Sequence, residues 1–181
     1  YRIPSAIGAI LAIWFTWLAG AALVGRRAAA LGAALFGISM LMVAEGHIAK
    51  TDAMQAAAIT AMMAGLARAF MRWQETPDAK ARWSDIVLIW AGLGIAALIK
   101  GPVGLMVGGG AVVLAGLLGG GFRWLKMTRP AIGVPLALLV FSPWAIAITI
   151  QTGGQFWYDA IWGDMLSKVA GAQEKHGGFI G

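Results

Sequence analysis

Hydrophobic residues occur in six long runs along the chain, separated by short segments that hold most of the charged residues. A helix that crosses a bilayer needs about 20 mostly apolar residues, because the hydrocarbon core is roughly 30 Å thick. Each run approaches that length, so the pattern predicts an all-α protein, a multispan transmembrane helical bundle with about six spans. The predicted spans are Pro4–Val24, Ala28–Ala44, Ala53–Met71, Trp83–Ile99, Val103–Gly120 and Ala131–Ile150.

The stretch after the sixth span, residues 151–181, is predicted to be an outward-facing loop. Thr152, Gly153 and Gly154 break the preceding helix. Large apolar residues then recur at helical spacing, which predicts a helix lying along the membrane surface. These residues are Phe156, Trp157, Ile161, Trp162 and Leu166. Residues 1–181 are predicted to form a single transmembrane domain. We expect it to be a fragment of a longer chain, because it starts at Tyr1 instead of a methionine and stops within a glycine-rich polar stretch that ends at Gly181.

The composition supports a membrane protein and excludes several other classes. Hydrophobic residues make up 60% of the 181 residues and charged residues only 12%. Soluble domains are roughly a quarter charged, so an ordinary soluble, disordered or nucleic-acid-binding protein is excluded. The chain has no cysteine, which excludes a disulfide framework, a thiolate metal site and a cysteine nucleophile within these residues.

Lys and Arg residues are distributed unequally between the two predicted membrane faces. Lys and Arg are retained on the cytoplasmic side of membrane proteins, so the richer face is assigned as cytoplasmic. On the other face basic and acidic residues balance, and the whole net charge of +6 falls on the basic face. Arg68, inside the third span, is predicted to anchor the helix by extending toward the headgroups. The basic residues on the cytoplasmic face are Arg26, Arg27, Arg68, Arg72, Lys80, Arg82, Arg123, Lys126 and Arg129.

The densest polar cluster on the opposite face comprises Glu45, His47, Lys50 and Asp52. Asp52 begins the third span, where its carboxylate can cap the helix together with Gln55, and capping is at least as good an interpretation as catalysis. Glu45 ends the second span, where the helix dipole disfavours a negative charge. A salt bridge to Lys50 or His47, a metal ion or a cationic substrate can compensate it. One histidine beside one carboxylate is too little to specify zinc, so a divalent metal is left open and no other cofactor is predicted.

Lys100 is a second candidate on the same face. It ends the fourth span and is followed by Gly101 and Pro102, which stop the helix and leave the ammonium group at a turn. A lysine is a compact charge suited to a phosphate group. On the physics of the sequence alone, an interfacial lysine that only extends toward the headgroups is a slightly better interpretation.

Several short motifs occur in an order that resembles bacterial membrane glycosyltransferases of the protein-O-mannosyltransferase and aminoarabinose-transferase superfamily. The likeness covers nearly the whole chain. The motifs are Arg2-Ile3-Pro4-Ser5-Ala6, Thr51-Asp52-Ala53-Met54, Lys100-Gly101-Pro102, Ser142-Pro143-Trp144, Asp164-Met165-Leu166 and Glu174-Lys175-His176-Gly177.

The resemblance implies a multi-pass enzyme of the bacterial inner membrane. It implies transfer of a sugar from a polyprenyl-phosphate carrier to a lipid or protein acceptor on the periplasmic face, with membrane lipids as further partners and no nucleic acid. Asp52 then matches a catalytic acidic residue, and Lys100 is suited to the carrier phosphate. Glu45, His47 and Lys50 are expected to border the same substrate cavity.

The sequence departs from the family pattern in two places. The family's principal acidic pair would precede Tyr1, and the proline expected after the His-Gly pair is replaced by Gly178-Phe179-Ile180.

A transporter and a noncatalytic membrane scaffold are the alternative functions. Transporters carry ionisable residues near the bilayer midplane on broken helices. The candidate acids here lie at span ends, which favours the enzyme.

Overall fold

The computed structural model describes residues 3–47 and 51–158, and its elements there are all helical, which confirms the predicted all-α class. The chain divides into two compact units, Tyr1–Phe141 and Ser142–Gly181. The elements are α1 (Ile3–Leu23), α2 (Arg26–Gly37), α3 (Met40–His47), α4 (Asp52–Glu75), α5 (Trp83–Lys100), α6 (Val103–Leu118), the 3-10 helix η1 (Arg123–Thr128), α7 (Pro130–Thr152) and α8 (Gln155–Tyr158).

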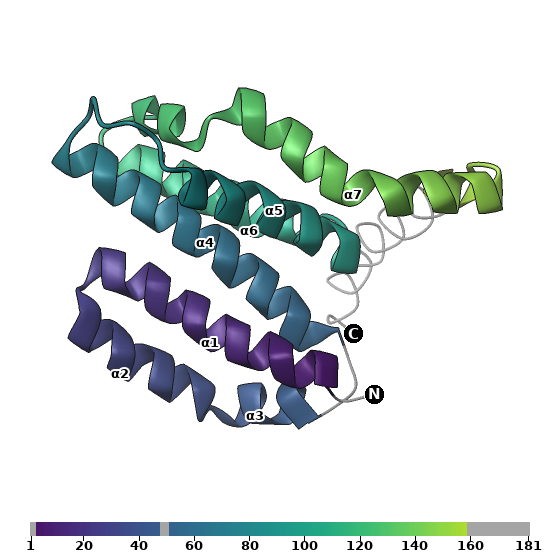
Figure 1. The fold of residues 1–181 in the computed structure, drawn as a ribbon, viewed down its shortest axis with the longest axis horizontal. Helices are drawn as coiled ribbons and strands as arrows, with labels where there is room; N and C mark the ends of the chain where they lie inside the picture. Colours follow the sequence, from purple (N-terminus) through teal and green to yellow (C-terminus); the bar gives the residue numbers. More distant parts are fainter. Residues whose placement is uncertain (1–2, 48–50, 159–181) are drawn as a thin grey trace, which may run out of the picture. The chain divides into compact units, whose positions relative to one another are not determined.

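Helix α4 is the centre of the first unit, and it lies between α1 on one side and α5 and α6 on the other (Figure 1). Its buried positions are mostly alanines, so neighbouring helices approach its backbone closely. At Gly8 of α1, a Cβ atom would lie 2.7 Å from the backbone nitrogen of Met54 and 2.8 Å from the carbonyl carbon of Ala53. The start of α1 therefore packs directly against the first turn of α4.

The other side of α4 packs against α5 and α6 in the same way. A Cβ atom at Gly92 of α5 would lie 2.8 Å from the carbonyl oxygen of Ala58. Gly104 of α6 faces Ala96, and Gly108 faces the sulfur of Met62, so these two glycines allow close helix contact. Around Met62 a core of apolar side chains joins α4, α5 and η1: Leu66, Ala69, Ile89, Trp124 and Met127.

The second predicted span, Ala28–Ala44, is not one continuous helix. Helices α2 and α3 replace it and meet at a bend of 62°. The Ser39 hydroxyl donates to the carbonyl of Phe36 at 2.7 Å and accepts the backbone N–H of Met42 at 3.4 Å. Ser39 thus caps α3 with its side chain, and Gly37 just before it weakens the continuation of α2.

The described residues accordingly support fewer than six spans. Within the described residues, four helices are long and apolar enough to cross a membrane, or five if α2 and α3 together form one broken span. The fifth predicted span becomes α6, which has 16 residues. That is shorter than the roughly 17 residues that a crossing helix requires. The four long helices are α1, α4, α5 and α7.

Residues 142–158 form the described part of the second unit. Helix α7 ends at Thr152, as the sequence predicts, because Gly153 and Gly154 take positive φ angles of 58° and 88°. In this unit the ring of Phe156 packs edge-on against Trp144, with centroids 5.5 Å apart. Helix α8 covers the first residues of the predicted interfacial helix. The later apolar residues of that predicted interfacial helix lie outside the described part of the chain: Ile161, Trp162 and Leu166.

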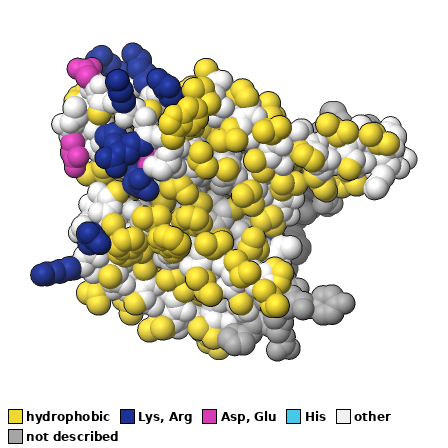
Figure 2. Space-filling model, in the orientation of Figure 1, with side chains coloured by type: hydrophobic (Ala, Val, Ile, Leu, Met, Phe, Trp, Pro, Cys, Tyr) yellow, Lys and Arg dark blue, Asp and Glu magenta, His cyan; other side chains and the backbone are white. Residues whose placement is uncertain are grey.

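The surface of the helices is largely apolar, as Figure 2 shows. Many large hydrophobic side chains are exposed, among them Ile10, Leu31, Met106 and Leu139. In water this surface would be strongly unfavourable, whereas lipid solvates it. Lys and Arg side chains gather at one end of α4 and beside the turn between α1 and α2 (Figure 2).

The close contact at Gly8 gives a stability prediction. We expect Gly8→Ala to lower the free energy of unfolding by about 1–3 kcal/mol, because the added methyl group meets backbone atoms that cannot rotate away. Gly32→Ala in α2 is the matched control, since nothing lies within 4 Å of the added atom. Thermal unfolding of both purified variants in detergent measures the difference. Equal melting temperatures would show that α1 and α4 are less closely packed than described.

Candidate functional site

Two of the residues singled out from the sequence, Asp52 and Lys100, meet in the structure. Helices α4 and α5 are neighbours joined by the short segment 76–82, so they run antiparallel and the start of α4 lies beside the end of α5. Asp52 is the first residue of α4 and Lys100 is the last residue of α5. The Nζ of Lys100 donates to the Oδ1 of Asp52 in an ion pair between residues 48 positions apart.

The helix ends hold both charges in favourable positions. A carboxylate is stabilised at a helix N-terminus and an ammonium group at a helix C-terminus, and Asp52 and Lys100 occupy those positions. After Lys100 the chain turns at Gly101, whose φ of 59° and ψ of −122° favour glycine. Pro102 then precedes α6. The predicted Lys-Gly-Pro turn therefore forms as expected and keeps Lys100 at the edge of the bundle.

The pair is accessible to a ligand. The side chain of Lys100 is 44% exposed and that of Asp52 is 31% exposed. Exposed ion pairs contribute little to stability, typically about 1 kcal/mol or less. The contact is thus weak enough for an incoming anion to compete with Asp52 for the ammonium group.

The predicted capping box at the start of α4 does not form. The N-cap position belongs to Thr51, one residue before Asp52, and it has no side-chain capping bond. Gln55 does not complete the reciprocal contact, because neither its Oε1 nor its Nε2 has a hydrogen-bond partner among the described residues. The predicted N-cap position was wrong by one residue. With the helix starting at this position, the Gln55 side chain points into the protein.

The sequence interpretation named Gln55 only as a capping partner of Asp52 and did not predict its burial. Gln55 is only 5% exposed. It lies near the start of α4, three residues after Asp52. Burying an amide without hydrogen bonds costs roughly 1–3 kcal/mol. The signal that pointed to it was a lone glutamine inside a run of alanines and other apolar residues.

Glu45 lies in the last turn of α3, a helix that contacts both α1 and α4. It is half-buried, and its Oε2 has no hydrogen-bond partner among the described residues. Its predicted partners cannot be compared with it, because Lys50 and the side chain of His47 lie outside the described part of the chain. The described residues also include no group of three His, Asp or Glu side chains that could hold a metal ion.

The chemistry available at this end of the first unit is acid–base and electrostatic. A carboxylate at Asp52 can accept a proton from a hydroxyl group, and the ammonium group of Lys100 can hold a phosphate. When a phosphate oxygen takes the place of Asp52 at Lys100, the carboxylate leaves the ammonium group and can accept a proton from a second substrate.

Comparison with known proteins identifies a family that this chain matches. The profile of a protein family described as "Dolichyl-phosphate-mannose-protein mannosyltransferase" matches residues 1–146. This range includes every candidate residue named from the sequence, from Glu45 to Lys100. No curated protein matches the chain, and no solved structure does.

Proposed function

Because the chain belongs to the dolichyl-phosphate-mannose-protein mannosyltransferase family, we propose that sugar transfer takes place at the contact between Asp52 and Lys100. Members of this family are glycosyltransferases. The protein is thus a multi-pass membrane glycosyltransferase that uses a polyprenyl-phosphate sugar donor. The ion pair between the start of α4 and the end of α5 is the observation that carries the assignment of the site.

In the proposed reaction Lys100 and Asp52 have different roles. Lys100 Nζ binds the phosphate of the donor and stabilises the negative charge that develops on it as the bond between the sugar carbon and the phosphate oxygen breaks. Asp52, released from Lys100, accepts the proton of the acceptor hydroxyl as its oxygen bonds to the same sugar carbon. The products are the glycosylated acceptor, the polyprenyl phosphate and a protonated Asp52, which returns its proton to water.

The remaining candidate residues are assigned to the border of the substrate cavity. Glu45 offers a carboxylate oxygen without a partner among the described residues, which suits the hydroxyl groups of a sugar. His47 and Lys50 follow it in the sequence and are proposed to contact substrate as well. The acceptor is proposed to be a lipid or a protein. The site is proposed to face the periplasm from a bacterial inner membrane, in keeping with the balanced charge of this face.

Replacing Lys100 tests its assignment to the donor phosphate. We expect Lys100→Gln to raise the KM for the lipid-linked donor roughly tenfold or more, since a charge-assisted hydrogen bond to the phosphate is lost. The yield of folded protein should stay close to that of the wild type. Lys126→Gln, an exposed lysine of η1, is the control and should leave the KM unchanged. A loss of yield that matches the loss of transfer would make Lys100 a structural anchor instead.

Labelling in intact cells tests the membrane face. Residues 1–181 contain no cysteine, so single cysteines can be introduced without background. Thr51→Cys, beside Asp52, should react with a membrane-impermeant maleimide from the outside. Asp78→Cys, in the exposed segment between α4 and α5, should react only after the membrane is opened. Labelling of both from the same side would contradict the proposed topology.

A further inference from the structure

A cavity lined by arginines lies at the far end of α4, away from Asp52 and Lys100. It has a volume of about 410 Å³ and lies between the C-terminal parts of α1 and α4 and the end of the segment that leads into α5. Arg68 is 16 residues after Asp52 on the same helix. At 1.5 Å per residue that separation is roughly 24 Å. The cavity is therefore distinct from the proposed site of sugar transfer.

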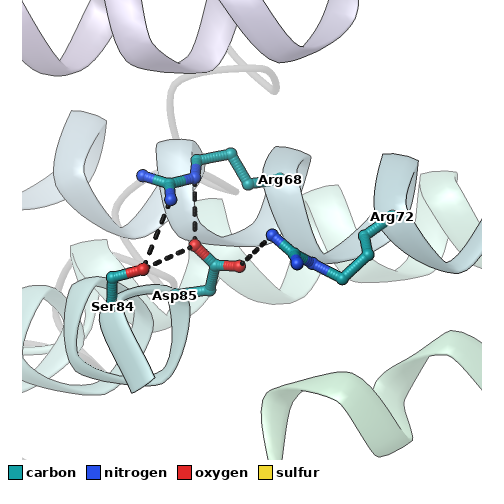
Figure 3. Close-up of polar contacts among 4 residues, drawn as sticks. All are labelled: Arg68, Arg72, Ser84 and Asp85. Atoms are coloured by element: carbon teal, nitrogen blue, oxygen red, sulfur yellow. Dashed lines mark hydrogen bonds and ion pairs between the residues drawn. The ribbon is translucent and has the colours of Figure 1, made fainter. Parts of the chain in front are cut away.

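Three guanidinium groups line this cavity: Arg68 and Arg72 from α4, and Arg82 just before α5. Two of them are held in place by a buried carboxylate (Figure 3). Arg68 Nε lies 3.0 Å from Asp85 Oδ1, and Arg72 Nη2 lies 3.2 Å from Asp85 Oδ2. The side chain of Asp85 is only 2% exposed. The sequence predicted only that Arg68 extends toward the headgroups, and the structure adds that its guanidinium is held by Asp85.

Asp85 orients the arginines without using all their donors. A guanidinium group has five N–H donors. Arg68 Nη2 also donates to Ser84 Oγ at 3.3 Å, whereas the buried Nε of Arg72 has no hydrogen-bond partner among the described residues. Arg82 makes no ion pair within the ranges that the structure describes. Asp85 thus fixes the guanidinium groups of Arg68 and Arg72 beside the cavity, and a guanidinium has more donors than these contacts use.

The local charge and surface indicate the ligand. Three arginines face two carboxylates, Glu75 in the cavity wall and Asp85 behind it, so a net positive charge remains. The α1 side of the cavity is apolar and is formed by Leu18, Ala21 and Ala22. Leu23 and Val24 next to it are exposed large hydrophobic residues. A cationic recess beside an apolar helix surface suits a ligand that has both an anionic head and a hydrocarbon tail.

We propose that this arginine cavity binds the phosphodiester headgroup of an anionic phospholipid, with its acyl chains along α1. Guanidinium groups match phosphate oxygens in geometry, and basic recesses between helices at the cytoplasmic edge of membrane proteins recognise anionic lipids. The cavity lies on the face that the charge distribution predicts to be cytoplasmic. The bound lipid fixes α1 to α4 at this end and leaves the opposite end to the transfer reaction.

Native mass spectrometry of the whole purified protein, titrated with phosphatidylglycerol, phosphatidylcholine or inorganic phosphate, tests the proposal. Wild-type protein should retain phosphatidylglycerol with a dissociation constant at least tenfold lower than that for phosphatidylcholine. Arg82→Gln should raise the constant for phosphatidylglycerol roughly tenfold, as expected for the loss of one charge-assisted contact. This variant leaves the contacts of Asp85 intact, so folding is preserved. Arg27→Gln is the control, because Arg27 is an exposed arginine at the start of α2 that does not line the cavity.

Each arm has a result that would overturn the proposal. Equal binding of phosphatidylglycerol and phosphatidylcholine would show that the arginines do not select an anionic headgroup. Binding of inorganic phosphate that displaces phosphatidylglycerol at equal concentration would assign the cavity to a free anion instead of a lipid. An equal effect of Arg82→Gln and Arg27→Gln would reduce the interaction to the overall positive charge of this face.

Discussion

We expect Asp52→Asn to abolish or strongly reduce sugar transfer and to leave the protein folded. Asparagine keeps the size of the side chain and suits the first turn of a helix nearly as well as aspartate. It removes the negative charge that accepts the proton of the acceptor hydroxyl, and loss of such a group lowers a rate about 10²- to 10⁴-fold. The measurement is transfer of labelled sugar from a polyprenyl-phosphate donor by the whole purified protein, compared at equal amounts of folded enzyme.

The cost of this substitution in stability should be small. Asp52 and Lys100 are both about a third or more exposed, so their ion pair is screened and is worth about 1 kcal/mol or less. Asp78→Asn removes an exposed carboxylate at the other end of α4 and should leave transfer unchanged. Transfer by Asp52→Asn at the wild-type rate would restrict Asp52 to its ion pair with Lys100 and would leave the proposed reaction without a base.

We expect Asp85→Ala to have the opposite profile, with a large effect on stability and none on the chemistry. The carboxylate is buried and holds both Arg68 and Arg72 (Figure 3). Removing one partner of a buried ion pair costs roughly 3–5 kcal/mol. The arginine side chains are 23% and 19% exposed, so they can partly turn toward water, and we expect a loss near the lower value, about 3 kcal/mol. Thermal unfolding in detergent measures it.

Two variants make the interpretation of Asp85 specific. Asp85→Asn keeps one acceptor oxygen for an arginine and should fall between Asp85→Ala and the wild type. Asp78→Ala is the matched control, because Asp78 is an exposed aspartate on the neighbouring segment. Transfer per folded molecule should be unchanged in Asp85→Ala, since Asp85 lies at the other end of α5 from Lys100. If Asp85→Ala and Asp78→Ala unfold at the same temperature, the buried carboxylate contributes nothing to the packing of α4 and α5.

The helices themselves were predictable because their signal is local. A long apolar run satisfies its backbone hydrogen bonds in lipid only as a helix, so run length alone defines the element. The prediction Pro4–Val24 differs from α1, Ile3–Leu23, by one residue at each end. The prediction Trp83–Ile99 misses only the last residue of α5. The second span failed because Ser39 forms hydrogen bonds with its own backbone neighbours, a detail that hydropathy does not register.

The charged residues show where prediction from the sequence stopped. Asp52 and Lys100 were both recognised as candidates, but as a helix cap and as a residue near a turn, and nothing local connects positions 48 residues apart. Arg68 was interpreted as an anchor for the same reason. Its partner Asp85 lies on the next helix, and only the antiparallel packing of α4 against α5 brings the two together.

The sequence alone therefore determined three properties. The protein is a helical membrane protein, its few charged residues can be identified, and one of its two membrane faces is basic. Those properties depend on composition and on runs of about 20 residues, and each is evaluated without knowing what lies beside it. The tertiary structure alone decided which charges meet, that Asp52 contacts Lys100 and that Asp85 orients two arginines. Coulombic and hydrogen-bond contacts act over a few ångströms, and that proximity is created by the glycine- and alanine-mediated packing of α1, α4, α5 and α6.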